Sequence, residues 1–202
     1  MHPVLDRVVS QIENELRGFD AETTQLHPGE HVHEWSLQQV IEHLVLGYRG
    51  TCGAMEARLK KGRLSQKQDR TYLQWLLQLM ILSFGRLPRG VPALKETTPT
   101  PDEFAKMDGR QLGECLRQEA EAMDLQFDRC RRKFGMERVA FHPWLGPLRV
   151  DQWRRFHAVH GVHHITQLRN VIARVAPAPL PIRVTAGKLA KEMGVPAQRP
   201  LA

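Results

Sequence analysis

Apolar residues recur every three or four positions along almost the whole of this chain. That spacing places them on one face of an α-helix, which has about 3.6 residues per turn. Five stretches show it, and we predict helices over residues 5–19, 36–61, 69–84, 108–134 and 150–175. No pair of segments shows the signals of a β-hairpin. The pattern therefore predicts an all-α fold: an up-down four-helix bundle with one additional helix.

Local signals support the start of the second predicted helix and lower the helix propensity inside it. Ser36 precedes the second predicted helix and Gln39 follows three residues later, which is the spacing of a capping box. Gly47, Gly50 and Gly53 lie inside the same helix, where they lower its propensity and point instead to close packing or to the approach of a ligand.

Prolines separate the predicted bundle from the end of the chain. Pro177, Pro179 and Pro181 follow the last helix and cannot continue it. We therefore divide the chain into a helical domain at residues 1–175 and a basic, proline-rich C-terminal extension at 176–202. Within the extension, residues 185–193 predict one short helix.

The charge balance narrows the range of partners. The chain carries 29 Lys and Arg against 22 Asp and Glu, a net charge of +7. Part of the excess lies in the extension, and the clusters Lys60–Arg63 and Arg129–Lys133 lie near predicted helix C-termini, where cations complement the helix dipole. We therefore expect no nucleic-acid partner. No apolar stretch is long enough to cross a membrane, and the N-terminus lacks the pattern of a signal peptide, so we expect a cytoplasmic protein without a membrane partner.

Histidine is the residue type that most suggests chemistry. Five of the ten histidines lie between His142 and His164. His160 and His164 are four residues apart on one predicted helix, so their imidazoles lie one turn apart on the same face and can grip one divalent metal. Gly161 stands where the helix of a zinc protease carries its catalytic glutamate, which excludes that class. These histidines could also be ordinary surface or core residues.

His43 is the third candidate ligand. It lies among apolar residues in the middle of the second predicted helix, where a polar side chain needs a partner. With His160 and His164 it would complete three nitrogen ligands and leave one position for water or substrate, as in a catalytic metal site. Such a site suits zinc, nickel, iron or copper, and the sequence does not choose among them. The sequence also offers no general base other than a group bound to the metal, so we assign no catalytic residues.

Two segments resemble a known family. Trp35-Ser36 followed by His43-Leu44 resembles one helix of the DinB-like proteins, a family of metalloenzyme-like bundles. A second stretch of the chain is similar to the closing segment of that family: residues 142–148, followed by Trp153, His160, His164 and Gln167. The resemblance implies a four-helix bundle that holds a divalent metal through His43, His160 and His164.

The same resemblance implies a function. Members of the DinB-like family include thiol-dependent S-transferases, so we expect a metal-dependent enzyme. Its metal would activate either a thiol, for transfer to a small substrate, or water, for hydrolysis of a small substrate. The partner would be a small molecule, such as a low-molecular-weight thiol, and a homodimer is the expected assembly. The alternative is a non-catalytic, stress-related bundle with a structural or vestigial metal.

Two further residues are expected beside the metal. His157 lies three residues before His160 on the same helix face; we expect it to line the pocket, with a fourth-ligand or proton-shuttle role left open. Gln167 is expected to orient an imidazole, although a solvated position on the helix fits the sequence equally well.

Overall fold

The computed structural model describes residues 1–29, 34–64, 69–88, 92–100 and 105–176. Within these ranges the chain is mostly helical and carries one small two-stranded sheet. The α-helices are α1 (Pro3–Leu16), α2 (Leu37–Lys61), α3 (Tyr72–Gln78), α4 (Gly109–Phe134) and α5 (Val150–Val175). The strands are β1 (Arg138–His142) and β2 (Gly146–Arg149), and short helical turns are Thr23–Gln25, Leu79–Ser83 and Lys95–Thr97. The predicted extension lies outside the described residues except for Ala176.

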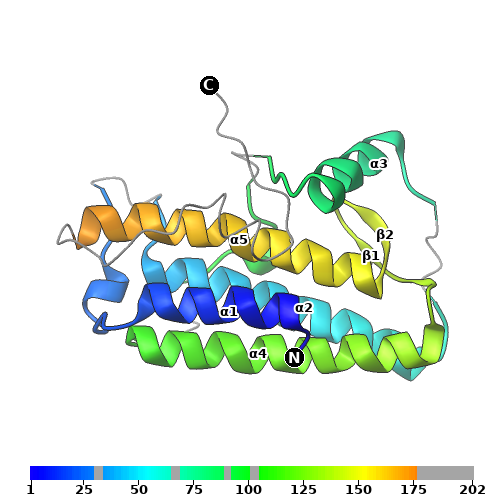
Figure 1. The fold of residues 1–202 in the computed structure, drawn as a ribbon, viewed down its shortest axis with the longest axis horizontal. Helices are drawn as coiled ribbons and strands as arrows, with labels where there is room; N and C mark the ends of the chain where they lie inside the picture. The colour runs from blue at the N-terminus through cyan, green and yellow to red at the C-terminus, as the bar shows by residue number, and fades with distance from the viewer. Residues whose placement is uncertain (30–33, 65–68, 89–91, 101–104, 177–202) are drawn as a thin grey trace.

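Four helices make the body of the molecule. In Figure 1, α1, α2, α4 and α5 run side by side along its length, while α3 and the β1–β2 hairpin sit together at one end beside α5. The core lies between the four helices. The apolar faces of α1 and α2 are buried there, and these ten residues are at most 1% exposed: Leu5, Val8, Val9, Ile12, Leu16, Leu37, Val40, Ile41, Leu44 and Tyr48.

The helix ends follow local chemistry. Ser36 and Gln39 form the predicted capping box at the start of α2, in which each side chain bonds the backbone N–H of the other residue. Asp108 and Gln111 form the same arrangement at the start of α4. Gly62 ends α2 in the left-handed conformation that glycine adopts without strain. The predicted bounds of the last helix agree with α5.

Three sequence predictions need correction. Residues 138–149 form an antiparallel hairpin, so the fold is not purely α-helical. The helix predicted over 69–84 is shorter: α3 covers seven residues and continues as a π-helical turn at Leu79–Ser83. Its apolar stripe is also only partly a core face, because Ile81 is 3% exposed whereas Leu73 is 64% exposed and Phe84 is 53% exposed.

The hairpin and α3 are fastened to each other through glutamine side chains. Gln78 is buried and donates from Nε2 to the backbone oxygen of Leu145 at 2.6 Å. Gln74 reaches the backbone oxygen of Pro143 at 3.5 Å. These bonds hold α3 over the connection between β1 and β2. No described helix is both long and apolar enough to cross a lipid bilayer.

Candidate metal centre

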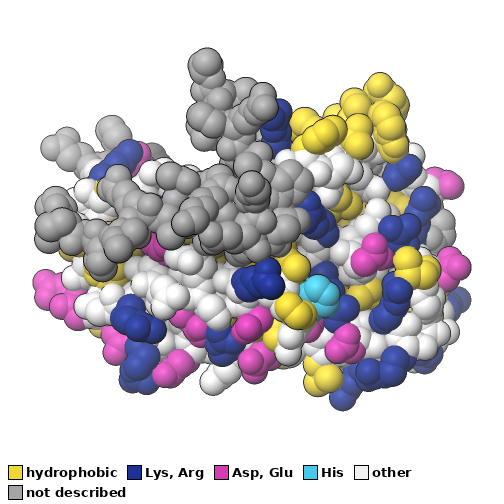
Figure 2. Space-filling view, viewed as in Figure 1, with side chains coloured by type: hydrophobic (Ala, Val, Ile, Leu, Met, Phe, Trp, Pro, Cys, Tyr) yellow, Lys and Arg dark blue, Asp and Glu magenta, His cyan; other side chains and the backbone are white. Residues whose placement is uncertain are grey.

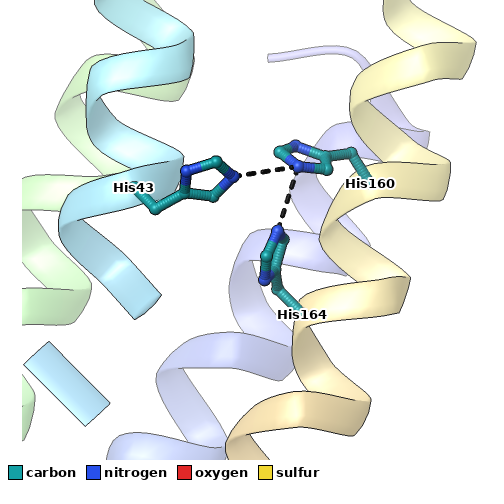
Figure 3. Close-up of side chains that lie close together, drawn as sticks. All are labelled: His43, His160 and His164. Atoms are coloured by element: carbon teal, nitrogen blue, oxygen red, sulfur yellow. Dashed lines mark hydrogen bonds between the residues drawn. The ribbon is translucent and has the colours of Figure 1, made fainter. Parts of the chain in front are cut away.

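Helices α2 and α5 bring the three predicted ligands together. His43 lies in the second turn of α2, and His160 and His164 lie one turn apart in the middle of α5. Figure 3 shows the three imidazoles pointing toward one another across the space between the two helices. His43 and His164 are buried and His160 is partly exposed. The neighbouring turns of both helices are apolar and pack into the core, and this packing fixes the backbone positions of the three histidines.

The Nε2 atoms form the centre of the cluster. Nε2 of His160 lies 3.2 Å from Nε2 of His43 and 3.0 Å from Nε2 of His164. One ring nitrogen from each of the three residues falls within 4.8 Å of the others. This set could hold one metal ion, because each histidine offers one donor atom to a common point.

The outward ring nitrogens are held by oxygen atoms. Nδ1 of His43 lies 2.8 Å from the backbone oxygen of Thr97. Because a carbonyl oxygen only accepts, His43 must carry its proton on Nδ1, and its neutral ring therefore presents a bare lone pair at Nε2. Nδ1 of His164 lies 2.8 Å from Oε1 of Gln167, which orients that ring in the same way. Such oxygen partners are typical of histidines that bind metals.

Hydrogen bonds between the three rings cannot give every Nε2 atom a partner. The Nε2 atoms of His43 and His164 both present lone pairs toward His160. A neutral His160 has at most one proton on Nε2, so it can donate to one of the two and leaves the other without a donor. A cation at the common point would satisfy all three nitrogens. The donor set therefore fits a divalent ion that accepts imidazole ligands.

The electrostatics of the cluster favour the neutral rings that metals require. Burial lowers the pKa of His43, although its hydrogen bond to Thr97 opposes this. Burial, reinforced by the neighbouring histidines, holds the pKa of His160 and of His164 well below the ordinary value. All three rings are then uncharged at neutral pH, with lone pairs available for coordination.

The cluster forms part of the wall of a large cavity of about 1070 Å³. Aromatic rings flank the histidines inside it: Trp35 lies 5.0 Å from His43 between ring centroids, and Phe156 stacks on His160 at 5.4 Å. Gly47 and Gly50 also line the cavity, and a Cβ atom at either would meet no atom of the described residues within 4 Å. Of the two explanations raised for these glycines, the structure therefore favours ligand approach over close packing.

His157 lines the same cavity but does not join the cluster. Its Nε2 lies 3.0 Å from Oγ1 of Thr51, and burial lowers its pKa to about 3. Its Nδ1 has no hydrogen-bond partner within the described part of the chain. The structure thus places His157 as a buried, neutral pocket residue. Gln167 lies where the sequence suggested, against an imidazole of the cluster.

Two contributors to the site were not among the predicted site residues. Thr97 acts through its backbone oxygen, and no side-chain pattern marks a carbonyl for such a role. His142 ends β1 and also lines the cavity; its Nδ1 accepts hydrogen bonds from the backbone N–H groups of Trp144 and Leu145. The pair His142-Pro143 was visible in the sequence, but its role depends on the hairpin.

A family model matches residues 14–171, a span that contains all three histidines of the cluster and Gln167. The chain belongs to the DUF1569 family. That family is described as one of proteins of unknown function. The resemblance to the DinB-like family is therefore wrong, because the model that matches is that of DUF1569. No curated protein and no solved structure matches the chain. DUF1569 membership thus supplies no activity.

Proposed function

We propose that this DUF1569 protein is a metal-dependent enzyme in which His43, His160 and His164 hold one divalent ion. The observation that carries the proposal is the convergence of three Nε2 atoms in the wall of a cavity, with two of the rings fixed from behind by Thr97 and Gln167. Zinc, nickel, iron and copper all suit such a donor set. As part of the proposal, the four long helices act as an up-down four-helix bundle that keeps α2 and α5 at a fixed separation.

The composition of the cluster supports catalysis over a purely structural ion. No further His, Cys, Asp or Glu of the described residues belongs to the group of three. His157, which the sequence left open as a fourth ligand, has its Nε2 engaged with Thr51 instead. Structural zinc sites use four protein ligands, whereas catalytic sites use three and take water or substrate as the fourth.

A divalent ion in such a site lowers the pKa of a water or thiol that completes its coordination, and so supplies a nucleophile at neutral pH. The support for a thiol came from the DinB-like resemblance and falls with it. We therefore name water as the nucleophile and hydrolysis of a small molecule as the reaction. Trp35 and Phe156 would hold the apolar part of that molecule beside the histidines.

The second candidate is a structural ion. The cluster joins α2 to α5 and also ties down the segment that contains Thr97, so an ion there would brace the fold without any turnover. The two candidates predict the same metal binding. They differ in whether the metal-loaded protein accelerates a reaction.

An activity assay separates them. Tag-free protein loaded with zinc is screened against p-nitrophenyl esters and phosphates, with a thiol and an electrophilic aromatic chloride as a second arm. Turnover that disappears in His160→Ala and persists in His163→Ala is the expected result, because His163 adjoins His164 but is not among the three candidate ligands. Stoichiometric zinc without any rate difference between wild type and His160→Ala would assign the ion a structural role.

A further inference from the structure

The outer side of α3 and of the turn that follows it exposes large hydrophobic side chains. We call this surface the α3 face, and its exposed fractions run from 38% to 74%. It consists of Tyr72, Leu73, Trp75, Leu79, Met80 and Phe84. Figure 2 shows hydrophobic side chains gathered over α3, where they stand out from the body of the molecule. A cluster of this kind on an isolated surface typically marks an interaction site.

The opposite side of α3 already has a role. Leu77 and Ile81 line the cavity, and Ile81 is only 3% exposed. Gln74 and Gln78 fasten the helix to the hairpin. The α3 face is therefore presented on an anchored helix, and its side chains are not needed to close the core.

The end of the molecule that carries this face is basic. The last turn of α2 holds Arg58, Lys60 and Lys61, and the last turn of α4 holds Arg131, Arg132 and Lys133. Nζ of Lys133 bonds the backbone oxygen of Leu59, so the two basic turns lie together. In Figure 1 both helices end on the same side of the molecule as α3 and the hairpin.

The charge of the chain around α3 restricts what can cover the face. Between residues 57 and 90 the sequence has eight Lys or Arg and one acidic residue, Asp69. A second copy docked here by two-fold symmetry would place one basic segment against another. The chain's own segment 177–202 carries four cations and only Glu192 as an acidic residue, so it is also mismatched in charge. The favoured occupant is both apolar and anionic.

We propose, against the expectation from the sequence that there is no membrane partner, that the α3 face docks on the surface of an anionic lipid bilayer. Trp, Tyr, Phe and Leu side chains would enter the boundary between headgroups and acyl chains, while the cations at the same end contact anionic headgroups. α3 has seven residues, so this contact is peripheral and does not span the bilayer. Docking would bring the cavity, whose wall includes Leu77, close to the lipid surface. The proposal does not depend on the metal centre.

Vesicle sedimentation tests it with tag-free protein. Vesicles of phosphatidylcholine alone are compared with vesicles that also contain phosphatidylglycerol. We expect binding to the anionic vesicles only. Raising the ionic strength from about 0.1 M to about 1 M should weaken it, because the screening length falls from about 10 Å to about 3 Å. Absence of binding to phosphatidylglycerol vesicles at low salt would overturn the proposal.

Matched variants locate the contact. Leu73→Glu places a charge in the α3 face, and Leu125→Glu adds the same charge at a 49% exposed leucine on α4. Leu73→Glu should weaken vesicle binding about tenfold or more, since it removes a leucine that would enter the bilayer and adds a charge that anionic headgroups repel. Leu125→Glu should bind as wild type does. Equal binding by the two variants would contradict the proposal.

One further measurement uses the natural chain, so that misfolding of a variant cannot explain its result. Another tests whether a second copy of the chain covers the α3 face. Brominated lipids in the anionic vesicles should quench tryptophan fluorescence of the otherwise unaltered protein, and Trp75→Phe should lose most of that quenching. Unchanged quenching in Trp75→Phe would place the contact elsewhere. Light scattering that shows a dimer in wild type and a monomer in Leu73→Glu would assign the α3 face to a second copy and overturn the proposal.

Discussion

Nε2 of His43 lies 3.2 Å from Nε2 of His160, although 117 residues separate the two in the chain. The contact joins α2 to α5, and His164 enters it from the next turn of α5. Thr97 and Gln167 bond the Nδ1 atoms of His43 and His164. The positions of the Nε2 donor atoms therefore depend on residues that would not themselves touch a metal. That dependence can be measured.

Gln167→Leu should weaken metal binding without unfolding the protein. Gln167 bonds Nδ1 of His164 at 2.8 Å, and loss of such a partner typically costs about 10–100-fold in metal affinity. Asn170→Leu is the control, because Asn170 lines the cavity one turn further along α5. Competition with a chromogenic chelator measures both affinities. Equal affinities for the two variants would mean that Gln167 does not orient His164.

The pH dependence of stability should reveal the buried histidine of the hairpin. Burial lowers the pKa of His142 from 6.5 to about 4. Between these values the unfolded chain binds a proton that the folded protein excludes, so the free energy of unfolding falls as the pH drops below 6.5. Above pH 6.5 this contribution is constant. His157 acts in the same direction, because burial lowers its pKa to about 3.

His142→Asn isolates that contribution. The asparagine oxygen can still accept from the backbone N–H groups of Trp144 and Leu145, but the side chain does not titrate. Between about pH 7 and about pH 5, wild type should lose about 2 kcal/mol more free energy of unfolding than the variant. Urea unfolding at both pH values measures the difference. Parallel losses in the two proteins would show that His142 titrates normally in the fold.

Two glycines in long helices should respond oppositely to alanine. A Cβ atom on Gly161 would lie 2.4 Å from Cγ1 of Val8, where α5 meets α1, so Gly161→Ala should destabilise the protein by about 1–3 kcal/mol. A Cβ atom on Gly53 would meet no atom within 4 Å in the part of the chain that the structure describes, so Gly53→Ala should stabilise α2 by about 0.5–1 kcal/mol. Urea unfolding measures both, and shifts of the same sign would contradict this view of the packing.

The sequence predicts α2, α4 and α5 well because each combines a long apolar stripe with a clear start or stop. It does not predict the hairpin, because the strands are five and four residues long and β2 has three buried residues in succession instead of an alternation. The sequence around α3 is so rich in apolar residues that their spacing does not indicate which face of the helix is buried. Which of them are exposed depends on how α3 packs over the hairpin.

Within the site, the sequence indicates the side chains but not their geometry. The four-residue spacing of His160 and His164 follows from helix geometry and is readable directly. The approach of His43 depends on the packing of α2 against α5, and the role of Thr97 depends on a backbone oxygen. The DinB-like resemblance rested on two short segments of histidine, tryptophan and proline spacings. Those spacings did not identify the family.

Metal content measured by elemental mass spectrometry on tag-free protein tests the central claim most directly. Wild type, His160→Ala and His163→Ala are each incubated with zinc, nickel or iron and then freed of unbound metal. The account predicts one divalent ion per chain in wild type and in His163→Ala, and none in His160→Ala. Absence of bound metal in wild type, or equal content in wild type and His160→Ala, would contradict a metal centre at these three histidines.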